Sequence, residues 1–166
     1  MAIALLTLTL VGTVSLGWTV WLGYHVPGSV PVGRHFVLAL GSTFLLVMAH
    51  SFIMFFLIAT GVEMKDMEKA GGWGDSFRRR TIALKGQVFP VMTLAILVVM
   101  ANFILGAAAH TRAIPAWAHG VLAWLTLAIS LMALWREYLV LGENNRLIEE
   151  AAMRRSRGQA PAAPPK

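Results

Sequence analysis

The sequence lacks cysteine and has few charged residues, and each shortage excludes a class of protein. Without cysteine the chain can form no disulfide framework, thiolate zinc site, iron–sulfur cluster or cysteine nucleophile. Charged residues make up 13% of the chain and hydrophobic residues 57%, whereas an ordinary soluble domain has about 25% charged residues. The composition therefore indicates an integral membrane protein.

Four apolar stretches are long enough to cross a bilayer, which requires about 20 mostly apolar residues in a helix. Their apolar runs are continuous and do not alternate in polarity as the strands of a membrane barrel do. The predicted fold class is an all-α integral membrane protein, a four-transmembrane-helix bundle. Its spans cover residues 3–24, 35–62, 88–109 and 116–135.

The 166 residues allow one domain, which we expect to cover 1–153. Helical composition continues beyond the fourth span and predicts a cytoplasmic helical extension over 136–153. The second helix should project beside it and end at Gly71 and Gly72, where a helix C-cap is expected. Residues 154–166 form a basic, proline-rich segment that predicts a disordered tail.

Lys and Arg are unevenly distributed among the segments that join the spans. The loops after the first and third spans hold one each, Arg34 and Arg112, whereas the second loop and the C-terminal part hold six each. Cytoplasmic segments carry the excess of these residues, so both termini should lie in the cytoplasm. We expect the membrane to be a prokaryotic inner (plasma) membrane. The net charge of +6 then reflects topology and attraction to anionic headgroups, and no nucleic acid partner is needed.

Four of the five histidines fall near the outer ends of the predicted spans. They are His25, His35, His110 and His119. Two facing histidines at one depth can ligate a haem b iron, and His35 and His119 match best in depth. A copper or zinc site and a purely interfacial role remain open alternatives. In architecture alone, four spans with outer histidines resemble the haem-bearing membrane anchors of respiratory complexes.

His50 is the exception, because it lies fifteen residues beyond His35, or about 22 Å along a helix. This spacing predicts a position near the bilayer centre, with no carboxylate at that depth. We expect a neutral imidazole that is hydrogen-bonded to a hydroxyl or amide of another helix. The intramembrane polar candidates include Thr13, Asn102 and Thr126. Proton relay or ligand binding is the alternative role for His50.

No catalytic constellation is visible, because all eight acidic residues are expected at or below the cytoplasmic interface, away from the outer histidines. The sequence predicts a non-catalytic membrane subunit or scaffold of a larger assembly, such as a redox complex, with partner subunits or further copies of itself. A haem b electron-transfer protein is the first alternative. A small transporter or channel is the second, although no intramembrane charge is expected.

Overall fold

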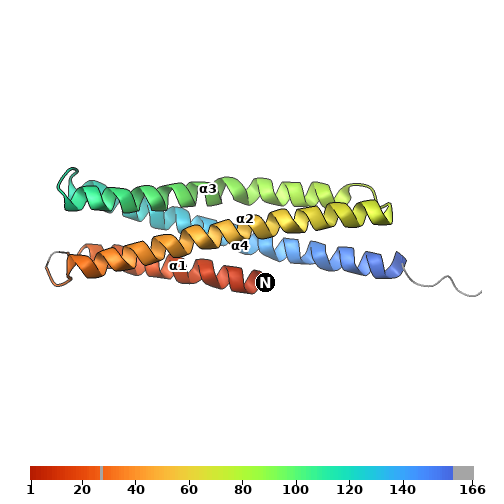
Figure 1. Ribbon diagram of the computed structural model, residues 1–166, viewed down its shortest axis with the longest axis horizontal. Helices are drawn as coiled ribbons and strands as arrows, with labels where there is room; N and C mark the ends of the chain where they lie inside the picture. The colour runs from red at the N-terminus through yellow and green to blue at the C-terminus, as the bar shows by residue number, and fades with distance from the viewer. Residues whose placement is uncertain (27, 159–166) are drawn as a thin grey trace, which may run out of the picture.

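The computed structural model describes residues 1–26 and 28–158, which form four helices joined by short turns (Figure 1). α1 covers Ala2–Gly23, α2 covers Val32–Gly71, α3 covers Ser76–His110 and α4 covers Ala116–Gly158. Each of them is long and apolar enough to cross a membrane. The prediction of an all-α protein with four such helices is confirmed.

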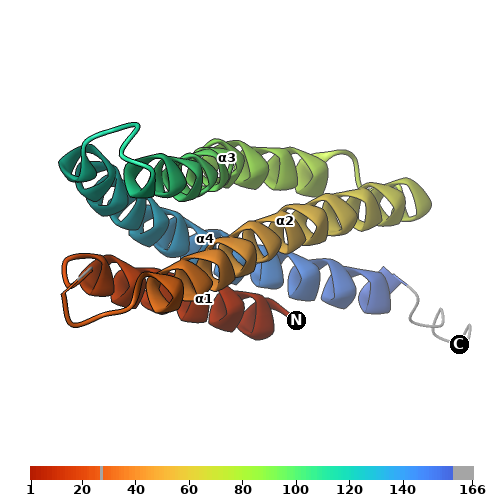
Figure 2. The same cartoon turned by 60° about the vertical axis from the view of Figure 1, so that its left-hand side comes forward.

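The four helices form a bundle in which α2 and α4 make the diagonal contact. Each helix packs against the next one in the chain, and α1 also packs against α4. Across the bundle α2 touches α4, whereas α1 and α3 make no contact within the described residues. Figure 2 shows α2 and α4 crossing near the middle of the bundle. Side chains of α2 and α4 can therefore meet in the core.

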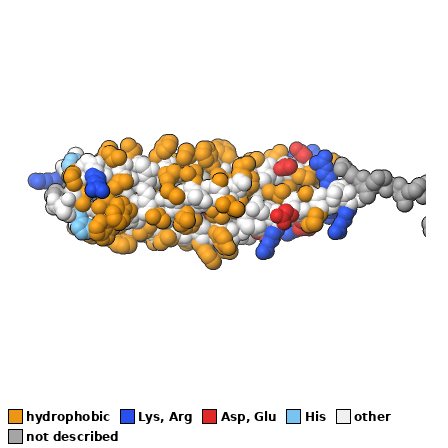
Figure 3. Space-filling model, turned by 90° about the horizontal axis from the view of Figure 1, so that it is seen from below, with side chains coloured by type: hydrophobic (Ala, Val, Ile, Leu, Met, Phe, Trp, Pro, Cys, Tyr) orange, Lys and Arg blue, Asp and Glu red, His pale blue; other side chains and the backbone are white. Residues whose placement is uncertain are grey.

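The two ends of the bundle differ in length and charge. α1 has 22 residues, whereas α2, α3 and α4 have 40, 35 and 43 and continue beyond its N-terminus (Figures 1 and 2). We call residues 63–87 and 136–158, most of which lie in this projecting part, the charged end, because acidic and basic side chains gather there (Figure 3). The opposite part, residues 24–35 and 110–119, is the histidine end. α1 measures about 33 Å, close to the roughly 30 Å of a bilayer core.

A buried carboxylate fixes the turn between α2 and α3. Gly72 ends α2 in the left-handed conformation at φ 64°, as the sequence predicts for a C-cap. One oxygen of Glu68, Oε1, then accepts the backbone N–H groups of Phe77 at 2.6 Å and Arg78 at 3.3 Å. These are among the first N–H groups of α3, which have no partner within the helix. The negative charge of a carboxylate at the N-terminus of a helix also interacts favourably with the helix dipole.

An exposed ion-pair network joins α3 to α4 at the charged end. The Arg80 guanidinium donates hydrogen bonds to Glu150 at 2.7 Å and to Glu143 at 3.1 Å. The bond to Glu150, followed by the one to Glu143, raises the pKa of Arg80 above its usual value. Exposed pairs of this kind contribute about 1 kcal/mol or less.

Two helices extend beyond the predicted spans. α3 begins at Ser76, twelve residues before the predicted span, and α4 continues to Gly158, five residues into the predicted tail. The remainder of that tail, 159–166, lies outside the described residues. The helices persist because their apolar faces stay paired: Phe77 and Leu147 belong to the same buried cluster as Ile53.

Candidate functional site

His35 and His119 meet at the histidine end of the bundle core. Each lies in the first turns of its helix, α2 and α4. The two ring centres are 6.5 Å apart and the ring planes are nearly perpendicular, at 83°. Within the described residues, the Nδ1 atoms of both rings are buried and have no hydrogen-bond partner. The structure thus brings together the two histidines whose depths match in the sequence.

Each imidazole of this pair faces a glycine on one of the other two helices. A Cβ atom on Gly23 of α1 would lie 3.2 Å from Cε1 of His35, and one on Gly106 of α3 would lie 3.0 Å from Cε1 of His119. Both distances are tighter than an ordinary contact, so a side chain at either glycine would require the facing ring to shift by a few tenths of an ångström. At this level of the bundle α2 and α4 contribute the histidine side chains, and α1 and α3 contribute the two glycines that face them.

The other two histidines of this end lie outside the pair. The His25 ring packs on Trp21 with centres 4.4 Å apart, and its Nδ1 lies 3.0 Å from the carbonyl oxygen of Trp21. His110 is exposed as the last residue of α3. In the part of the chain that the structure describes, no three His, Cys, Asp or Glu side chains gather as a metal site would require. A metal site with three ligands of these types is therefore not formed within the described residues.

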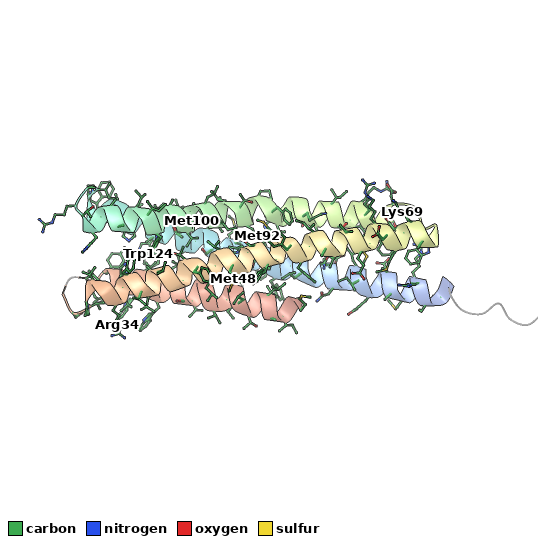
Figure 4. All side chains as sticks on the ribbon, viewed as in Figure 1. Arg34, Met48, Lys69, Met92, Met100 and Trp124 are labelled. Carbon is green, nitrogen blue, oxygen red and sulfur yellow. The ribbon has the colours of Figure 1, made fainter. Side chains whose placement is uncertain are left out.

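Two arginines give the histidine end its positive charge. Arg34 directly precedes His35, and Figure 4 shows Arg34 where α2 begins, at the opposite end of the bundle from Lys69. Arg112 lies in the turn between α3 and α4 with a left-handed backbone, φ 61°. Both side chains are exposed and can reach an anionic group at the bundle surface.

A second polar site lies deeper in the core, where His50 of α2 meets Glu137 of α4. His50 Nδ1 and Glu137 Oε1 are 2.5 Å apart, and both residues have 0% exposure. The prediction that no carboxylate lies near His50 is wrong, and so is the placement of all acids outside the bundle. α4 remains helical beyond Trp135, and its turn directs Glu137 into the core while Arg136 stays exposed.

The predicted hydroxyl or amide partners of His50 are occupied elsewhere or lie apart from it. The Thr13 hydroxyl donates to the Thr9 carbonyl at 2.8 Å, and the Thr126 hydroxyl donates to the Leu122 carbonyl at 2.7 Å. A hydroxyl in an apolar helix usually donates to a backbone carbonyl of the preceding turn. Asn102 Oδ1 is buried without a partner within the described residues. His50 does face the bundle interior, as expected.

The pair lies between the middle of α1 and its N-terminus. Ala2 and Leu5, which begin α1, share a buried cluster with Ile53 and Leu57, the next residues of α2 after His50 on the buried face. Counted from the histidine end, His50 therefore lies about two thirds of the length of α1 away, at about 22 Å from the level of His35. The position of His50 near the bilayer centre stays a prediction.

Comparison with known proteins gives no relative for this arrangement. The chain matches no protein-family model, and no curated protein or solved structure is detectably similar to it.

Proposed function

We propose that the protein is an integral-membrane electron-transfer subunit that binds one haem b between His35 and His119. The observation that carries this proposal is the separation of 6.5 Å between the two ring centres across the α2–α4 diagonal. Two imidazoles on opposite sides of one iron, with metal–nitrogen bonds of about 2 Å, have ring centres about 6 Å apart. A small rotation of the side chains would bring their nitrogens into line.

Small residues lie next to the pair on the other two helices. Gly23 of α1 and Gly106 of α3, which contact the two rings, would lie beside a haem held by His35 and His119. Ala107, Ala108 and Ala109 continue this stretch of small residues along α3. The propionates of haem require cations at the surface, and Arg34 and Arg112 are the Lys or Arg side chains that the histidine end offers.

Bis-histidine ligation favours electron transfer over chemistry at the iron. A haem held by both His35 and His119 would supply one-electron transfer and would not offer a site for oxygen or substrate. The protein would orient this group within the membrane, and the bundle would exchange electrons with a partner. This role agrees with the predicted subunit of a larger assembly, to which it adds a cofactor.

A visible absorption spectrum of the purified protein tests the proposal. We expect a Soret band, and an α-band on reduction, at a content of about one haem per chain. His35→Ala and His119→Ala should each abolish both bands while the protein stays helical and monodisperse. His25→Ala and His110→Ala are matched controls at the same end of the bundle and should keep the bands.

Two results would overturn this function. A folded wild-type protein without haem bands, prepared from haem-replete cells, would leave the cofactor-free subunit or scaffold as the better reading. Equal loss of haem in all four histidine variants would show that the ligands are not the pair in the core. In the first case, proteins that co-purify in mild detergent would define the assembly.

A further inference from the structure

The second oxygen and the second nitrogen of the Glu137–His50 pair have no partner. His50 Nε2 and Glu137 Oε2 are buried, and neither forms a hydrogen bond with any described residue. An ionisable pair that only stabilises a fold usually has its remaining atoms satisfied, because each buried unpaired polar atom costs free energy. Two such atoms on one pair therefore point to a small polar ligand that is not part of the chain.

Within the described residues, no other acidic or basic side chain lies in the core at the level of this pair. α1 has no titratable side chain over Ala2–Gly23, and α3 has none between Lys85 and His110. In α2 the nearest acidic or basic residues are His35 and Glu63, and in α4 the adjacent Arg136 is exposed. A proton gained or lost at the pair therefore changes the charge of the core without compensation from a neighbouring side chain.

Beyond the buried apolar residues Leu57 and Leu141, the next buried polar side chains toward the charged end are those of Thr60 and Asn144. Asn144 lies seven residues after Glu137 on the same buried face of α4, about 10 Å along the helix. The Thr60 hydroxyl donates to Asn144 Oδ1 at 3.1 Å, while Asn144 Nδ2 is buried without a partner within the described residues. The Lys85 ammonium lies beside Gly61, the residue after Thr60, because a Cβ on Gly61 would lie 3.0 Å from its Nζ.

We propose that His50 and Glu137 form a proton-binding site that exchanges with water at the charged end by way of Asn144. The proton is added at His50 Nε2 or Glu137 Oε2 and leaves from the same atoms, and the net charge of the site alternates between zero and minus one. Water bridging Glu137 to Asn144 passes the proton over a distance that no direct hydrogen bond spans. This inference does not depend on haem at His35 and His119, because the two sites share no residue.

Proton exchange at His50 can be measured directly by solid-state NMR. The full chain, labelled with nitrogen-15 in histidine, is placed in lipid bilayers, and the His50 signals are assigned by their loss in His50→Gln. We expect the His50 ring protons to show magnetisation transfer from water and to exchange rapidly after transfer into deuterated buffer. Absence of both effects in the wild-type protein would overturn the proposal and leave a dry structural pair.

A matched pair of asparagine variants tests the route. Asn144→Leu should slow exchange at His50 by about tenfold or more, whereas Asn102→Leu should leave its rate unchanged. Asn102 is the proper control because it is also buried and also has an unpartnered side-chain atom, but lies on α3 toward the histidine end. Equal exchange rates in the two variants would contradict a route through Asn144.

Discussion

Gly106 leaves the space into which the His119 ring packs, and this close approach can be tested by filling it. In Gly106→Val the new side chain must displace His119, and overpacking of this kind costs about 1–3 kcal/mol. Gly86→Val is the control, because it places the same residue in the same helix where no atom lies within 4 Å of the Cβ. Thermal unfolding in detergent, followed by circular dichroism, should show a lower Tm for Gly106→Val alone. Equal Tm values would mean that α3 and His119 are not in close contact.

The His50–Glu137 pair should show strong energetic coupling. Removal of one partner leaves the other buried and unpaired, so His50→Leu and Glu137→Leu should each destabilise the protein, by up to about 3–5 kcal/mol. The double variant should lose much less than the sum of the two, because no unpaired polar group remains. Unfolding of all four proteins by denaturant measures the coupling, and simple additivity would show that the two side chains do not interact.

The residues of the two sites differ in how far the sequence reveals them. Counting residues from the ends of the spans places His35 and His119 at one depth, since every helix rises by the same amount per residue. Counting gives no rotation about the helix axis, so it cannot show that the rings face each other. Glu137 is missed for a related reason: it follows Arg136 in an apparent interfacial segment. Only the seven-residue spacing of Ser130, Glu137 and Asn144 marks its buried face.

The start of α3 depends on a side chain from another helix. Glu68 of α2 accepts two N–H groups at the beginning of α3, so Glu68→Ala should destabilise the charged end by about 1 kcal/mol. Glu63→Ala removes an exposed carboxylate from the same helix and should have little effect. Amide hydrogen exchange at Phe77 and Arg78 reports the change locally. Unaltered protection at these two amides in Glu68→Ala would contradict the capping role.

The end of a helix can be predicted from the sequence where the residues that form it are close together in the chain. Gly71 and Gly72 end α2, because Gly72 adopts the left-handed conformation, which ends a helix without a contact from another part of the chain. The N-cap residue of α3 is Asp75, a residue type typical of this position, but its side chain makes no capping hydrogen bond and Glu68 of α2 supplies the acceptor instead. Hydropathy alone therefore places the start of the third helix at the membrane boundary and misses its polar first turns.

The orientation of the whole bundle in the membrane follows from where its charges lie. Among the described residues, eleven Lys and Arg occupy the charged end and two occupy the histidine end. Because the end richer in these residues stays in the cytoplasm, we predict that the histidine end and its His35–His119 pair face the outside. The Glu137–His50 site would then exchange its proton with the cytoplasm.

Single cysteines can test this orientation, because the chain has no cysteine of its own. Ser29→Cys places a thiol in the turn at the histidine end, and Ser156→Cys places one on the exposed surface of α4 at the charged end. A membrane-impermeant maleimide added to spheroplasts should label Ser29→Cys at once and Ser156→Cys only after permeabilisation. The reverse pattern would show that eleven basic residues had crossed the membrane in preference to two, and would place the proton-exchanging end outside.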